Sequence, residues 1–167
     1  TKLNIVLKIT NKTRLLSIKI KTNTQIIVKC AKWNLHSEEE NKNDIKCAIV
    51  ICTHNRHSYL KNTLETLKHT LPQNWGVYIT DNNSTPPVEI DPGLDDRFTL
   101  IQNKNTGGSG GFTRGIVEAL RKKDQWSHVL LMDDDIVLDG NVLKRTDTFL
   151  KVLKPEYLNH FLSGGML

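Results

Sequence analysis

The sequence contains little cysteine and no long apolar run. Its three cysteines, Cys30, Cys47 and Cys52, do not have the spacing of a metal site. We interpret them as structural thiols in a reducing compartment. No signal peptide and no apolar stretch of membrane-spanning length supports export. We therefore expect a cytoplasmic protein.

The charge is uneven along the chain. The 167 residues carry a formal charge of +5, and residues 1–46 hold ten Lys and Arg against four Asp and Glu. This excess leaves two interpretations open, a solvated basic surface or peripheral contact with an anionic membrane at its inner face. Nothing in the pattern indicates nucleic acid. The length suits one domain with a small appendage.

The first part of the chain favours β structure. Short runs such as "LNIVLKI", "LLSIKIK" and "QIIVKC" alternate partly between apolar and polar positions, with turn-prone "TNKT" and "KTNT" between them. This pattern predicts hairpins with one wet face. We expect a β-rich segment over residues 1–33, and a polar linker over residues 34–45.

Residues 46–167 change to alternating strand and helix patterns. Strands are predicted in "CAIVICT", "WGVYITDN", "RFTLIQN" and "SHVLLMDDD", and "FLSGGML" favours a fifth. Helices are predicted between them, one with Leu60, Leu64 and Leu67 on one stripe and one with Phe112, Ile116 and Leu120. This alternation predicts an α/β domain with a mostly parallel sheet. Ligands of such sheets bind where the strands end, at their carboxyl edge.

Polar clusters follow every predicted strand. Thr53 and Arg56 stand where the first strand gives way to a helix, and Arg56 has the length to reach a base or a phosphate. Asp81 ends the second strand, where a carboxylate can accept from a base or a ribose hydroxyl. A capping or turn role remains the alternative for Asp81.

A glycine-rich stretch, "NTGGSGGFTRG", joins the third strand to a helix. Its glycines are costly in backbone entropy unless a positive φ or a close ligand requires them. They direct the free N–H groups of the helix start toward a bound group. Their spacing does not fit a Walker A loop or a Rossmann fingerprint.

Three acids, Asp133, Asp134 and Asp135, end the fourth strand. In an extended chain Asp133 and Asp135 point the same way and Asp134 points opposite. Mg²⁺ and Mn²⁺ prefer oxygen ligands and are held by one or two carboxylates together with substrate phosphates. We predict that Asp133 and Asp135 bind Mn²⁺ or Mg²⁺ there.

These motifs, in this order, resemble the nucleotide-binding half of family 2 inverting glycosyltransferases with the GT-A fold. The stretches "CAIVICTHNR", "ITDNNS", "NTGGSGGFTRG" and "HVLLMDDDI" carry the resemblance over residues 46–167. The combination of "GGSGGF" and "MDDDI" is most similar to the galactofuranosyltransferase branch. That branch builds galactofuranose-containing glycans from UDP-galactofuranose. In the family a β-rich segment precedes the catalytic domain.

The resemblance implies a role for each matching residue. Thr53 and Arg56 would flank the uracil, Asp81 would meet the uridine, and Asn105 would lie near the ribose or diphosphate. Asp134 would reach toward sugar or ribose hydroxyls. The implied nucleotide-binding residues are Thr53, Arg56, Asp81, Asn105, Gly107, Gly108, Asp133 and Asp134. The implied partners are a UDP-sugar donor and a glycan or lipid-linked glycan acceptor.

The resemblance also implies groups that the sequence does not show. An inverting transfer needs a general base, but Asp139, Asp147 and Glu156 match no base motif, and His160 matches no metal motif. We therefore expect no catalytic base within this chain. The base is expected after Leu167, in a longer enzyme of which these residues are an inactive fragment.

Two alternatives to a glycosyltransferase remain, a nucleotidyltransferase and a non-catalytic nucleotide-sugar-binding module. A nucleotidyltransferase usually has a glycine-rich loop with basic residues directly after the first strand. The turn at that point, "THNRHS", contains no glycine. The binding module is favoured only if the 167 residues are the complete protein.

Overall fold

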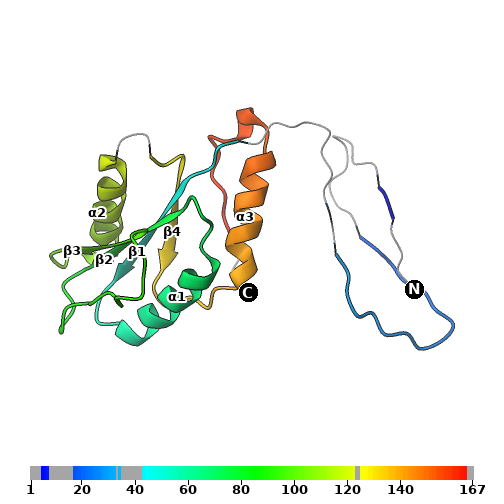
Figure 1. Ribbon diagram of the computed structural model, residues 1–167, viewed down its shortest axis with the longest axis horizontal. Helices are drawn as coiled ribbons and strands as arrows, with labels where there is room; N and C mark the ends of the chain where they lie inside the picture. The colour runs from blue at the N-terminus through cyan, green and yellow to red at the C-terminus, as the bar shows by residue number, and fades with distance from the viewer. Residues whose placement is uncertain (1–4, 8–16, 33, 35–42, 123–124, 165–167) are drawn as a thin grey trace. The chain divides into compact units, whose positions relative to one another are not determined.

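The computed structural model describes residues 5–7, 17–32, 34, 43–122 and 125–164. The chain divides into two units, residues 1–36 and 37–167. All helices and strands of the described residues belong to the second unit (Figure 1). The division falls within the linker predicted over residues 34–45.

The first unit differs from its prediction. Residues 5–7 and 17–32 form no strand, although β hairpins were predicted there. The predicted turn "TNKT" lies outside the described residues. Apolar side chains in the segment remain exposed, with Val6 at 95% and Ile27 at 83%. Strands without an apolar layer to cover them are marginally stable in water, which accounts for the difference.

The second unit is built on a four-stranded parallel sheet. Its strands are β1 (Cys47–Thr53), β2 (Gly76–Asp81), β3 (Phe98–Gln102) and β4 (His128–Asp133). The spatial order is β3-β2-β1-β4, and every pairing is parallel. The predicted α/β class and parallel sheet are thus confirmed. The winding reverses at β1, because β2 and β3 lie on one side of it and β4 on the other.

Helices cover both faces of the sheet. They are α1 (His57–Thr70), α2 (Gly107–Arg121) and α3 (Gly140–Val152), followed by a short 3-10 helix (Pro155–Tyr157). Ile49 and Ile51 of β1 pack with residues of α1 and α3 in one core cluster. Ala48 and Val50 point to the other face and pack with α2. Figure 1 shows α2 on the opposite side of the sheet from α1 and α3.

The apolar stripe predicted for the first helix is confirmed. Leu60, Leu64 and Leu67 of α1 are buried against the sheet. Trp75 joins the same cluster just before β2. Its indole N–H donates to Asp147 of α3 at 3.2 Å. This bond satisfies the polar end of a ring that burial would otherwise leave unpaired.

Helix α2 packs by small residues together with two of the three large ones predicted, Phe112 and Ile116, which are partly buried against the sheet. Its buried residues are Gly111, Gly115 and Ala119, while Leu120 is 61% exposed. A Cβ added to Gly115 would stand 2.4 Å from Val50 Cγ1, a separation that real contacts do not reach. The glycines therefore bring the helix backbone onto β1 and β2. Residues 107–111, predicted as a loop before the helix, form its first turn.

The end of the described chain departs from prediction. Residues 161–164 form no strand, so the predicted fifth strand is absent from this described part.

The last residues of the predicted linker pack within the second unit. Asn43 donates through its side chain to the carbonyls of Leu150 and Leu153 at 2.9 and 2.7 Å. It thereby caps the carboxyl end of α3, and Ile45 beside it is buried at 1% exposure.

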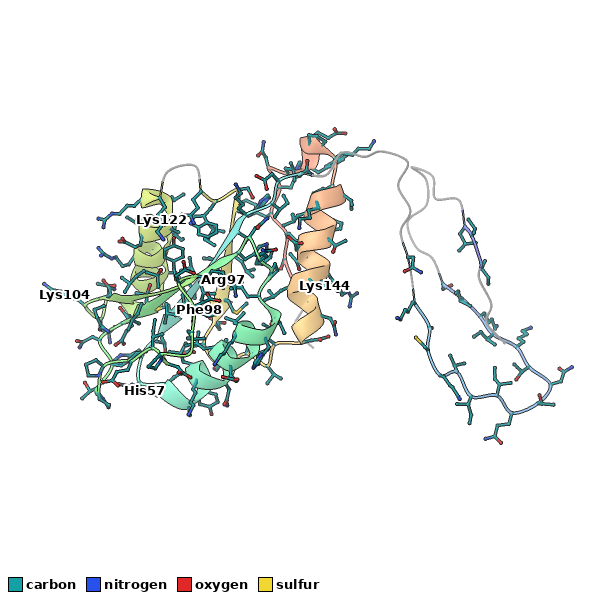
Figure 2. All side chains as sticks on the ribbon, in the orientation of Figure 1. His57, Arg97, Phe98, Lys104, Lys122 and Lys144 are labelled. Atoms are coloured by element: carbon teal, nitrogen blue, oxygen red, sulfur yellow. The ribbon has the colours of Figure 1, made fainter. Side chains whose placement is uncertain are left out.

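The exposed surface of the helices carries both charged and apolar side chains. Lys144 of α3 is exposed (Figure 2), and so are Leu120 of α2 at 61% and Phe149 of α3 at 47%. Within the described residues, none of the helices combines the length and the apolar character needed to cross a bilayer.

Candidate functional site

An open hollow of about 370 Å³ lies at the carboxyl edge of the sheet. It sits where β1 and β4 end, at the point where the winding reverses, which is the position that open α/β sheets use for ligands. The lining residues are Cys52, Thr53, His54, Arg56, Asn82, Asn105, Gly107, Gly108, Phe112, Asp133 and Asp134.

The hollow brings together most of the residues predicted from sequence. Every predicted nucleotide-binding residue lines it except Asp81. Of the predicted metal pair, Asp133 lines it and Asp135 lies just outside the lining. Four lining residues were not predicted, namely Cys52, His54, Asn82 and Phe112. Each lies within a motif quoted above, so their position at or after a strand end was the signal that could have identified them.

Asp134 is buried at 6% exposure although it borders the hollow. Its carboxylate accepts from the hydroxyl of Thr53 at 2.6 Å, and its backbone carbonyl accepts from the hydroxyl of Thr63 at 3.0 Å. These contacts tie the end of β4 to β1 and α1. The bond from Thr53 uses one acceptor position of the carboxylate, and the predicted contact of Asp134 with sugar or ribose hydroxyls stays a prediction.

Arg56 lies between the acids of β4. Its guanidinium donates to Asp135 and stands 3.8 Å from a carboxylate oxygen of Asp134. The bond to Asp135 and the negative charges of both acids raise the pKa of Arg56 above its ordinary value. Arg56 is the cation that the acidic cluster holds in this structure.

The acids fit part of a divalent metal site. Asp133 and Asp135 are both exposed on either side of buried Asp134, although β4 ends at Asp133 and the two acids that follow lie in a turn and not in the extended chain that was predicted. Among the described residues no group of three or more His, Cys, Asp or Glu side chains could hold a metal. Two carboxylates leave positions for phosphate oxygens and water, which is the ligand set that Mg²⁺ usually accepts.

The pKa of Cys52 reflects the electrostatics of the hollow. It is raised, first by burial and then by the negative charges of Asp134, Asp133 and Asp81. Like charges disfavour the thiolate, so the shift indicates a negative potential along this edge. Such a potential attracts a divalent cation. Cys47, buried deeper in β1, has its pKa raised to about 12 mainly by burial, which keeps it as an unreactive thiol.

Asp81 lies beside the hollow without reaching its surface. Its two carboxylate oxygens accept from the backbone N–H groups of Ser84 and Val88, each at 2.9 Å. Burial alone would raise the pKa of Asp81, but hydrogen bonds from Ser84, Val88 and Gln102 lower it below its ordinary value. In this structure Asp81 organises the loop after β2. Its predicted contact with uridine stays a prediction.

Replacing Asp81 by asparagine should lower the free energy of unfolding by about 1.5–3 kcal/mol at pH 7, because one bond of a buried charged acceptor is lost. A depressed pKa in the folded state means that the carboxylate stabilises the fold above about pH 4, and that this stabilisation disappears as the pH falls through the folded pKa. Urea unfolding of the wild type and of Asp81→Asn at pH 7 and pH 3 measures both effects.

The difference in free energy of unfolding between the wild type and Asp81→Asn should be smaller at pH 3 than at pH 7. The control is Glu89→Gln, which removes one charge from an exposed side chain in the same loop and should change stability by less than about 0.5 kcal/mol. An Asp81→Asn protein that unfolds like the wild type at pH 7 would contradict this account.

The turn between β1 and α1 is already engaged by the chain. The backbone N–H of Asn55 donates to the hydroxyl of Ser84 at 2.9 Å, and the side chain of Asn55 accepts from the N–H of Thr85 at 2.7 Å. The backbone N–H of Asn55 is therefore engaged within the chain. Asn55 has a φ of 56°, which asparagine tolerates better than most residues.

The start of α2 faces the hollow through Gly107 and Gly108. Gly107 has a φ of +71°, and its backbone N–H donates to the side-chain oxygen of Asn105 at 3.2 Å, while Thr106 at the N-cap makes no side-chain cap bond. The helix start that follows, with its positive dipole end, suits an anion. Arg114, in the second turn of α2, pairs with Glu118 at 3.5 Å on the same helix.

The acids beyond Asp135 have other partners. Asp139 caps α3 by accepting from the N–H of Asn141 at 3.0 Å. Asp147 bonds Trp75 and Lys151, and Glu156 lies in the 3-10 helix. None of these three acids lines the hollow, so the described residues offer no candidate for a base from this stretch.

The general base was expected after Leu167. Leu167 itself lies outside the described residues, which end at residue 164. The structure therefore does not test where the base lies, and its place beyond Leu167 stays a prediction.

Comparisons with known proteins agree on a family. The sequence pattern described as glycosyl transferase family 2 matches residues 48–151. Galactofuranosyltransferase GlfT2 of Mycolicibacterium smegmatis is 30% identical over 157 residues, covering 89% of this chain and 23% of the relative. GlfT2 of Mycobacterium tuberculosis gives the same identity and coverage.

Two further similarities are more limited. Galactofuranosyltransferase GlfT1 of M. smegmatis is 31% identical over 94 residues, covering 55% of this chain and 30% of the relative. The crystal structure of residues 1–349 of S. aureus TarS superposes with a TM-score of 0.48 at 20% identity, over 64% of this chain and 32% of that one. The chain spans about a quarter of the length of the GlfT2 relatives it matches.

Proposed function

Because the chain belongs to glycosyl transferase family 2, we propose that its hollow binds the UDP part of a UDP-sugar, and that the sugar is galactofuranose. The sheet and its covering helices agree with the GT-A architecture of such enzymes. Support for the donor comes from the galactofuranosyltransferases to which the chain is similar. A glycan or lipid-linked glycan is the proposed acceptor.

One observation carries the proposal. Asp133, at the end of β4, lines the same hollow as Gly107 and Gly108, at the start of α2. The carboxylate of Asp133 and the first residues of α2 thus face a shared space, although the N–H of Gly107 already donates to Asn105. A diphosphate bound there would meet N–H donors on one side and, on the other, acids able to hold its counter-cation.

In the proposed complex each group has a distinct role. Asp133 and Asp135 would hold Mn²⁺ or Mg²⁺, which when bound offsets the charge developing on the departing UDP. Gly107 and Gly108 would donate to phosphate oxygens. Arg56 would leave Asp135 and turn to the base or a phosphate, since the metal replaces it as the partner of that acid.

The proposed transfer is an inverting displacement at the anomeric carbon. It requires a general base that removes the proton of the acceptor hydroxyl. No acid of the described residues after Asp135 lines the hollow. We propose that the base and further metal ligands follow Leu167 in a longer protein, and that residues 1–167 alone bind nucleotide without transferring sugar.

Calorimetry with UDP, with and without Mn²⁺, tests the proposal. We expect UDP to bind, to bind more tightly when Mn²⁺ is present, and to be preferred over ADP and GDP. Preference for a nucleoside triphosphate would support a nucleotidyltransferase instead. Binding of no nucleotide would overturn the proposal, and sugar transfer by residues 1–167 would overturn its claim about the base.

A further inference from the structure

Asn82 follows directly after β2 and is 3% exposed at the wall of the hollow. Its backbone N–H donates to the carbonyl of Thr53 at 2.8 Å, which extends the pairing of β1 and β2 by one step. The backbone is thereby fixed, and the side chain projects from a rigid position toward the turn that joins β3 to α2.

The Asn82 amide uses its whole hydrogen-bonding capacity on that turn. Its oxygen accepts from the side chain of Asn103 at 2.9 Å and from the backbone N–H of Thr106 at 3.2 Å. Its nitrogen donates to the side-chain oxygen of Asn105 at 3.2 Å and to the carbonyl of Gly107 at 3.1 Å. A side-chain amide offers two donors and one acceptor oxygen with two lone pairs, so all are paired.

All four partners lie within residues 103–107. Asn105 and Gly107 also line the hollow, and Gly107 takes the left-handed φ of +71° that opens α2. A carboxylate in place of the amide would keep both acceptor bonds but lose both donors. It would also set a negative charge against the oxygens of Asn105 and Gly107.

We infer that Asn82 is a positioning residue for the nucleotide site, because its amide holds the Asn103–Gly107 turn in the shape that presents Asn105 and Gly107 to the diphosphate. The inference rests on the proposed function. Asn82 itself need not touch the nucleotide. Its effect should appear in affinity and in the conformation of the turn.

The test compares Asn82→Asp with Asn83→Asp by UDP calorimetry in Mn²⁺ at pH 8 and pH 5. Asn83 is the adjacent residue, it is exposed, and its φ of 67° suits Asp as it suits Asn. Both variants add the same charge one position apart. The UDP affinity of each variant is divided by that of the wild type at the same pH. The titration of UDP and of the metal ligands affects both proteins equally and cancels in this ratio.

We expect Asn82→Asp to bind UDP at least tenfold more weakly than the wild type at pH 8, and Asn83→Asp to stay within twofold. At pH 5 the deficit of Asn82→Asp should shrink, because a protonated carboxyl regains one donor to Asn105 or Gly107. A structural defect alone would not recover in this way. The amide resonances of Gly107 and Gly108 should move in Asn82→Asp without nucleotide and stay in place in Asn83→Asp.

The outcomes separate the two proposals. If the wild type binds no UDP, the proposed function fails and the inference fails with it. If the wild type binds and Asn82→Asp binds equally well at pH 8, or is equally impaired at both pH values, the inference alone is overturned.

A second variant covers failure of Asn82→Asp to fold. Asn103→Ala removes one of the two donors to the Asn82 oxygen and leaves Asn82 in place. Asn103 also donates to the hydroxyl of Thr106 at 3.1 Å, so the variant loses two hydrogen bonds within the turn. It should fold and weaken UDP binding by roughly threefold to tenfold. Wild-type affinity in Asn103→Ala would overturn the inference.

Discussion

Replacing Asp133 by asparagine should remove the Mn²⁺-dependent part of UDP binding and weaken affinity by roughly 10- to 100-fold. Asp133 is exposed and lines the hollow, so the loss of its charge changes cation binding directly. Losing a hydrogen bond or ligand contact to a charged group costs about 1.5–3 kcal/mol, and each 1.4 kcal/mol is about tenfold in affinity. Calorimetry of UDP with and without Mn²⁺ measures the effect.

The matched control for Asp133→Asn is Asp96→Asn. Asp96 is also exposed, but it precedes β3 and therefore stands at the opposite edge of the sheet. Both variants lose one negative charge, and only Asp133→Asn should lose the response to Mn²⁺. Equal UDP affinity for the two variants, with Mn²⁺ present, would contradict the assignment of Asp133 as a metal ligand.

Replacing Gly115 by alanine should destabilise the fold by about 1–3 kcal/mol, although alanine favours a helix. The added Cβ would stand 2.4 Å from Val50 Cγ1 and 2.9 Å from Thr80 Oγ1. Both neighbours are β-branched residues at 0% exposure in the middle of the sheet, so neither can swing aside. Helix α2 would have to lift away from β1 and β2. Urea unfolding measures the change.

Gly108→Ala is the control within the same helix. A Cβ at Gly108 meets nothing within 4 Å, so this variant should keep wild-type stability or gain up to about 1 kcal/mol from helix propensity. If Gly115→Ala lowers the free energy of unfolding and Gly108→Ala does not, close packing at Gly115 is the cause of the destabilisation. A Gly115→Ala protein as stable as Gly108→Ala would contradict it.

The sheet and its functional edge could be predicted because two signals were local. The run "CAIVICT" is apolar throughout, as a strand covered on both faces must be. The polar residues Thr53, Asp81 and Asp133 each come at a strand end, so parallel topology alone brings them to one edge. Neither signal requires knowledge of distant contacts.

What sequence reasoning missed depends on contacts between distant residues. The prediction for α2 relied on large apolar side chains, of which Phe112 and Ile116 pack on the sheet. It missed that Gly111, Gly115 and Ala119 are the residues in closest contact, because the sheet approaches the helix backbone there. The role of Asn82 depends on a turn more than twenty residues away. The hairpins predicted for residues 1–33 were inferred from the β propensity of their residues. That propensity reflects how well side chains pack on a half-buried sheet, and not an intrinsic preference of the backbone for the extended conformation.

The position of β4 across β1 from β2 and β3 has a consequence for folding. The first three strands can pair in the order in which they follow along the chain, and with the segments after them they supply every lining residue of the hollow except Asp133 and Asp134. A partly folded chain in which β4 has not docked lacks the acids, and so has nothing with which to recognise a metal–nucleotide complex. Ligand present during refolding would therefore leave early intermediates unaffected and act on the completed sheet, where a concentration one hundred times Kd adds about 2.7 kcal/mol of stability.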